Sequence, residues 1–303
     1  MEHNTIDSAL RQSSVRFSAW LREKQSAFAI KGLTSPVRQL TLLKPFSEYV
    51  LCNELLLSLG LEGRFLENLD WAWDQVECGD VITRLLLARP DSFCVASVYA
   101  PFHRRGFHNS RLESVLKSVS ELRGTQSVGM PAWLRLGFQH TMAQVMGTQY
   151  RPESAGATWL LAKSEPWFIN DDILYSITHE VFYASDFGRS LCQLHPDVLR
   201  YLEIWIPIWT RCYIEQGNWD ITGELIMVAE CLPEFSWDRN DPMPALLEQQ
   251  TESGEVQGLP GTGSSLLDGT ETQEQAAFYN CYHTTLVAAM AVSMRQRKLL
   301  THW

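Results

Sequence analysis

The segment from Asp171 to Gly188 has the sequence DDILYSITHEVFYASDFG, and its periodicity decides the fold class. Steps of three and four residues place polar side chains on one face of a helix, with apolar side chains around the rest of it. The polar stripe consists of Asp172, Ser176, His179, Tyr183 and Asp186. Because the stripe contains no lysine or arginine, it predicts an enclosed polar surface. A solvated face or a buried polar network between helices is an equal alternative.

Four further segments share this pattern of a helix-length apolar run interrupted by a polar group. They are Phe46 to Gly60 with Glu54, Trp133 to Gly147 with His140, Asn218 to Leu232 with Glu224, and Ala277 to Ala291 with Tyr282 and His283. Strand-like alternation is nearly absent, and prolines stand at positions typical of a first helical turn. We therefore predict an all-α fold, a single domain over residues 1–303 made of stacked helical hairpins, like an α/α toroid or solenoid.

Residues 238–272 differ from the rest in composition. Pro242, Pro244 and Pro260 fall in this stretch, together with the glycine-rich sequence GLPGTGSS that begins at Gly258. Such a segment buries little apolar surface, so we predict a long irregular loop, acting as a lid or as a strap for a partner. A last helix from about Gln273 to Leu299 then returns to the same domain.

The net charge and the hydropathy of the chain indicate which classes of molecule it binds. The chain has 25 Lys and Arg against 35 Asp and Glu, a net charge of -10, which opposes nucleic-acid binding and favours an amine-bearing ligand. No apolar run is long enough for a signal peptide core or a membrane span, so we expect a cytoplasmic protein without a membrane partner. The seven cysteines are spread singly, as is typical of a reducing compartment.

Three clusters carry candidate chemistry. In the first, His179 can exchange a proton near neutral pH, Asp186 is a candidate base or amine anchor, and Tyr183 is a hydrogen-bond donor. In the second, the loop YAPFHRRGFHN places His103, Arg104 and Arg105 where they can bind an anionic group or pair with nearby carboxylates.

The third cluster lies early in the last helix, where Tyr282 and His283 join Glu224 as candidate substrate-binding residues. The usual fingerprints of metal hydrolases, dinucleotide-binding folds, phosphate loops and hydrolase nucleophiles do not occur. His179-Glu180, for example, is not HExxH, because Tyr183 stands where the second histidine would be. We therefore predict no metal and no cofactor.

Four stretches together resemble a bacterial family of all-helical proteins from natural-product gene clusters. They are THEVFYASDFG at 178–188, YAPFHRRGFHN at 99–109, NWDITGELIMVAECL at 218–232 and YHTT at 282–285. The sequence also resembles the cyclase component of aziridine-forming enzymes of the azinomycin type. This resemblance implies ring closure by an amine that displaces a neighbouring sulfate, on a substrate attached to an amino-group carrier protein and with a small helper subunit.

The function predicted from sequence is thus a cofactor-independent cyclase or lyase acting on a small polar intermediate. Arg104, Arg105 and His103 would receive the departing anion, and His179 or Asp186 would remove the amine proton. Two alternatives remain open: a non-catalytic helical scaffold that binds a carrier protein, and a small-molecule hydrolase.

Overall fold

The computed structural model describes residues 2–58, 64–127, 129–150, 158–192, 194–237 and 240–301. Helices, turns and irregular segments make up these residues, and no strand occurs among them. The predicted all-α class is therefore confirmed, while the toroidal arrangement stays a prediction. Residues 1–27 and 159–303 form one compact unit, here called the terminal unit, and residues 28–158 form a second, the middle unit.

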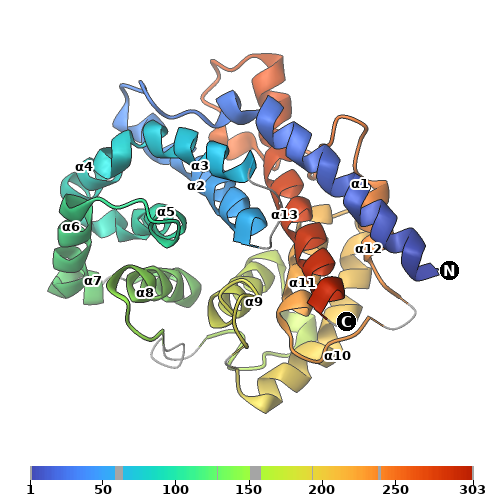
Figure 1. Ribbon diagram of the computed structural model, residues 1–303. Coiled ribbons are helices and arrows are strands. Elements are labelled where there is room, and N and C mark those ends of the chain that lie inside the picture. Colours follow the sequence, from blue (N-terminus) through green and yellow to red (C-terminus); the bar gives the residue numbers. More distant parts are fainter. Residues whose placement is uncertain are drawn as a thin grey trace. The chain divides into compact units, whose positions relative to one another are not determined.

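The terminal unit contains the N-terminal helix and the last five α-helices. Their bounds are α1 (Glu2–Glu23), α9 (Asp171–Ala184), α10 (Pro196–Glu215), α11 (Trp219–Cys231), α12 (Met243–Glu248) and α13 (Gln273–Thr301), with short 3-10 turns η1 (Gln25–Phe28, which runs into the middle unit), η5 (Pro166–Phe168) and η6 (Ser264–Leu266). α11 packs against α9, α10, α12 and α13, and α13 also packs against α1 (Figure 1). α11 is thus the central helix of this unit.

The middle unit is built from one long helix, α2, and several shorter ones. They are α2 (Pro36–Ser58), α3 (Arg64–Gln75), η2 (Glu77–Gly79), α4 (Asp80–Ala88), η3 (Pro90–Val98), α5 (Tyr99–Arg104), α6 (Ser110–Glu121), α7 (Arg123–Ser127) and α8 (Ala132–Met146). As the prolines predicted, α2 begins at Pro36, α8 follows Pro131, and α10 of the terminal unit begins at Pro196. These prolines fit because the first helical turn makes no use of the missing N–H.

A close approach of α11 to α13 sets the geometry of the terminal unit's interior. Nearly every side chain of α11 is buried, in keeping with a sequence that is apolar on most of its circumference. A Cβ atom at Gly223 would lie only 2.7 Å from Cγ1 of Val287, so only glycine allows this separation of the two helices. Asp220 precedes Gly223 by about one turn, and His283 precedes Val287 by about one turn, so the same crossing brings these two side chains together.

Residues 240–272 were expected to form an irregular loop that buries little, and this was wrong. They contain α12, which packs against α1 and α11, and a following stretch, residues 249–272, here called the strap, which packs on α13; residues 238–239 lie outside the described part of the chain. Met243, Leu246 and Val256 are fully buried or nearly so. The backbone of Val256 exchanges hydrogen bonds with the Thr285 hydroxyl, and the Gly258 N–H donates to Asn280 O at 3.2 Å. A Cβ at Gly263 would lie 2.3 Å from Tyr279 O, so its glycine serves close packing rather than flexibility.

α9 ends earlier than predicted. It stops at Ala184, and Asp186, Phe187 and Gly188 follow with φ angles of 48°, 54° and 74°, which form a left-handed turn. Ser185 holds this turn, because its hydroxyl donates to Val181 O at 2.8 Å and accepts from the Gly188 N–H at 3.1 Å. The expectation that Asp186 continues the helical stripe was therefore wrong.

None of the described helices combines the length and the hydropathy that a membrane span requires.

Candidate functional site

Two buried carboxylates lie one helical turn apart on α11. The exposed fraction of Asp220 is 5% and that of Glu224 is 3%. The spacing of four residues places both on the same face of the helix. Asn218 caps α11, its side chain accepting the Ile221 N–H, so Asp220 lies in the first turn, where the helix dipole favours negative charge.

Asp220 joins α11 to both α9 and α13. The hydroxyl of Tyr175 on α9 donates a hydrogen bond to its Oδ2. Nε2 of His283 on α13 lies 3.3 Å from Oδ1, a distance at which a protonated imidazole forms an ion pair. Within the described part of the chain Oδ1 accepts no hydrogen bond of good geometry and is closed off from solvent, so the His283 imidazole is the polar group that faces it.

Glu224 has a second imidazole beside it. The Thr178 hydroxyl donates to its Oε2, and Nδ1 of His179 lies 3.8 Å from the same oxygen. His179 Nδ1 is also 2.7 Å from the backbone oxygen of Tyr175, a contact that requires the proton to be on Nδ1. In the neutral imidazole the lone pair is then on Nε2, which makes His179 suitable as a base.

We call the five residues that combine these contacts the acid–imidazole cluster. They are Tyr175, His179, Asp220, Glu224 and His283. Burial raises the pKa of the Tyr175 phenol, and the carboxylates of Asp220 and Glu224 raise it further, so this side chain stays a hydrogen-bond donor. The cluster is partly open, because 28% of the His179 side chain is exposed.

Three members of the cluster, His179, Glu224 and His283, were predicted from the sequence, and the structure brings them together. Asp220 and Tyr175 were not predicted. The spacing of Asp220 and Glu224 in the sequence DITGE was a usable signal, because two acids four residues apart on an apolar helix share one face. Tyr175 gave no such signal, since its role depends on the packing of α9 against α11.

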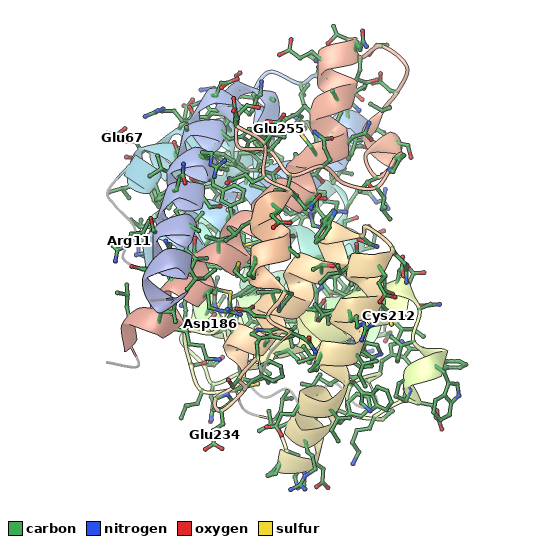
Figure 2. All side chains as sticks on the ribbon, turned by 90° about the vertical axis from the view of Figure 1, so that its right-hand side faces the viewer. Arg11, Glu67, Asp186, Cys212, Glu234 and Glu255 are labelled. Carbon is green, nitrogen blue, oxygen red and sulfur yellow. The ribbon has the colours of Figure 1, made fainter. Side chains whose placement is uncertain are left out.

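The other predicted residues of the terminal unit lie around the cluster. The ring of Tyr183 is 6.2 Å from that of His179, so it borders the site. Tyr282 is buried and stacks on Phe278, which indicates a packing role on α13. Asp186, labelled in Figure 2, lies in the turn after α9. Its Oδ1 is 3.6 Å from Arg189 Nη1. Its carboxylate is thus already beside a cation.

The predicted anion-binding residues are all in the middle unit. Nη2 of Arg105 lies 3.1 Å from Oε1 of the buried Glu54 and 3.1 Å from the backbone oxygen of the same residue. Nε of Arg104 lies 3.9 Å from Glu54 Oε1. These arginines therefore pair with a carboxylate of their own unit, the alternative that the sequence left open. His103 belongs to a different group, with His108 and Glu113. Whether these residues share a pocket with His179 stays a prediction.

A cavity of about 400 Å³ also lies in the middle unit. Side chains of α6, α7 and α8 line it together with residues 148–150 after α8, among them Arg135, Gln139, Met142 and Tyr150. None of the residues predicted from sequence to carry chemistry lines it. The acid–imidazole cluster remains the better candidate site, because it combines titratable groups with buried, oriented partners.

The structure thus defines the class: an all-helical protein whose described residues include a buried cluster of two carboxylates and two imidazoles. The chain belongs to the family described as a domain of unknown function (DUF6895), whose model matches residues 14–293. No curated protein and no solved structure matches the chain.

Proposed function

We propose that the acid–imidazole cluster catalyses proton transfer from the amine of a small molecule, in a cyclase or lyase reaction. The observation that carries this proposal is the arrangement of Asp220 and Glu224, two buried carboxylates that each lie beside a histidine from a neighbouring helix. A carboxylate next to an imidazole orients the ring and stabilises its protonated form, as general acid–base catalysis requires.

An amine is the substrate group that fits the local charge. The two carboxylates concentrate negative charge on one face of α11, and the chain as a whole carries -10. Burial lowers the effective dielectric constant, so a bound ammonium group is attracted more strongly than it would be at an exposed site.

The finer form of the proposal is aziridine formation, and it follows from the resemblance described above. One imidazole takes a proton from the ammonium group, and the freed lone pair forms the C–N bond as the C–O bond breaks. The electron pair of that bond leaves with the sulfate anion. The ring nitrogen then loses a second proton, so two bases are needed in each turnover, and His179 and His283 supply two imidazoles. The carrier-bound substrate, the helper subunit and the cytoplasmic location belong to this finer proposal.

The test is release of sulfate from a vicinal amino sulfate, such as 2-aminoethyl hydrogen sulfate, measured by ion chromatography. We expect His179→Asn and Asp220→Asn each to lower the rate by about 10² to 10⁴-fold, the usual contribution of a general acid or base. His195→Asn is the matched control, since this histidine is exposed and its side chain contacts Asp197, which is not a member of the cluster. Rates in His179→Asn and Asp220→Asn equal to that of the unchanged protein would refute the assignment.

The non-catalytic alternative is favoured by an aromatic surface in the segment before α9. Trp167 is 83% exposed, and Phe168 and Trp159 beside it are also exposed. Large exposed aromatic side chains are typical of protein interfaces. If the protein is a carrier-binding scaffold, Trp167→Ala should lower its affinity for the carrier, and His179→Asn should leave that affinity unchanged. The hydrolase alternative has a different test: its product would contain ¹⁸O when the reaction is run in labelled water.

A further inference from the structure

The turn between α5 and α6 brings together three side chains of types that bind transition metals. His103 lies in the last turn of α5, His108 in the connection, and Glu113 in the first turn of α6. The sequence spacing is regular, with four residues between successive members. Their ligand atoms, imidazole nitrogens and a carboxylate oxygen, all lie within 4.8 Å of one another.

The separations fit a common metal ion. A tetrahedral zinc ion holds nitrogen and oxygen ligands at about 2.0–2.2 Å, which places the ligand atoms about 3.3–3.5 Å apart. His108 Nδ1 is 3.3 Å from Glu113 Oε1, and His103 Nε2 is 3.9 Å from the same oxygen. Small side-chain rotations therefore suffice to bring all three atoms onto one ion.

Surrounding residues already orient the carboxylate. The buried Tyr99 hydroxyl donates to Glu113 Oε1 at 2.6 Å, and it accepts the Asn109 N–H at 3.1 Å. Asn109 in turn caps α6, and its side-chain amide donates to Cys78 O at 2.7 Å. A hydrogen-bonded second layer of this kind holds metal ligands in position and is a regular feature of metal sites.

From these contacts we propose that His103, His108 and Glu113 bind one zinc ion, with a fourth position open to solvent. Two imidazoles and one carboxylate match the ligand chemistry of zinc. The His108 side chain is 60% exposed, so water can reach the ion and occupy its fourth position. The ion would fasten the end of α5 to the start of α6. None of the three ligands belongs to the acid–imidazole cluster, so this inference does not rest on the proposed function.

The experiment is calorimetric titration of the metal-free full chain with zinc chloride, supported by cobalt(II) absorption spectra. We expect one ion per chain for the unchanged protein, and a rise in Tm upon binding. His108→Ala and Glu113→Gln should each lower the affinity by more than about 100-fold, because each removes a ligand. Tyr99→Phe, which removes only the orienting hydroxyl, should cost about 10-fold.

His195→Ala is the matched control. His195 is exposed and lies 3.7 Å from the carboxylate of Asp197, so it tests whether any histidine–carboxylate pair on this chain gives the same signal. Its zinc affinity should equal that of the unchanged protein. The proposal fails if the unchanged protein binds no zinc at one equivalent, or if both His108→Ala and Glu113→Gln bind it as tightly as before. Because His108 is at the surface, its removal is expected to leave the fold intact.

Discussion

The Tyr175 hydroxyl donates a hydrogen bond to Oδ2 of Asp220, and the backbone oxygen of Tyr175 lies 2.7 Å from Nδ1 of His179. One residue of α9 thus orients both a carboxylate and an imidazole of the acid–imidazole cluster. Its raised pKa keeps the phenol protonated, so this donor persists to high pH. Tyr175 is a positioning residue, because it acts on the substrate through Asp220 and His179.

The first prediction concerns Tyr175 and alkaline pH. Below about pH 10 the phenol is protonated in both folded and unfolded chains, whereas above it only the unfolded chain loses the proton. The free energy of unfolding should then fall by about 1.4 kcal/mol per pH unit for this group. Tyr175→Phe removes that dependence, although it also costs about 1.5–3 kcal/mol at pH 8 through loss of the bond to Asp220.

Urea unfolding of both proteins between pH 8 and 11 measures this effect. The two curves of unfolding free energy against pH should run parallel below pH 9 and converge above pH 10. Curves that stay parallel to pH 11 would show that the folded phenol titrates normally and that burial does not hold its proton.

The second prediction concerns the crossing of α11 and α13. Gly223→Ala places a methyl group 2.7 Å from Val287 Cγ1, and relieving this overlap costs about 1–3 kcal/mol. The gain in helix propensity offsets at most about 1 kcal/mol. Gly124→Ala is the matched control, because Gly124 is also helical and nothing lies within 4 Å of its added Cβ. We expect a lower Tm for Gly223→Ala, and an equal or higher Tm for Gly124→Ala.

Much of the fold could be predicted because its signals are local. Prolines set helix starts, and apolar spacing marked the five long segments, each of which contains a helix. The end of α9 was missed because the turn at Asp186 and Phe187 uses non-glycine residues with positive φ, which local propensity disfavours. Of the candidate site, His179, Glu224 and His283 were found as polar interruptions of apolar helices, whereas Tyr175 became visible only through tertiary packing.

The strap shows a second reason why the sequence did not predict part of the fold. Its glycines and proline predicted a loop with little packing, yet glycine also permits close approach of two backbones. Sequence does not separate these two uses of glycine, because both require only the absence of a Cβ. The contact of Gly263 with Tyr279 O distinguishes them.

The third prediction follows from that contact. A Cβ at residue 263 would overlap Tyr279 O, which is helix backbone and cannot move aside, so Gly263→Ala should lift the strap from α13. We expect faster limited proteolysis within residues 258–272, read by mass spectrometry, and a lower Tm. Thr285→Val, which removes the hydroxyl that bonds the Val256 backbone, should expose the same segment to a smaller degree. Unchanged cleavage in both variants would contradict the close packing.

The last prediction separates two roles for Arg105. Its Nη2 lies 3.1 Å from Oε1 of Glu54, whose side chain is almost fully buried, and a buried carboxylate that loses such a cation is costly. Arg105→Ala should therefore lower the free energy of unfolding by about 2–3 kcal/mol. This is less than the loss for a fully buried ion pair, because Arg105 is partly exposed and water screens part of the interaction. In the double variant Arg105→Ala, Glu54→Gln much of this loss should be recovered, since the buried charge from which the nearer cation was removed is itself gone. Urea unfolding gives all three values. If Arg105 instead serves mainly to hold a leaving anion, Arg105→Ala will weaken sulfate binding and leave the unfolding free energy nearly unchanged, and the double variant will recover nothing.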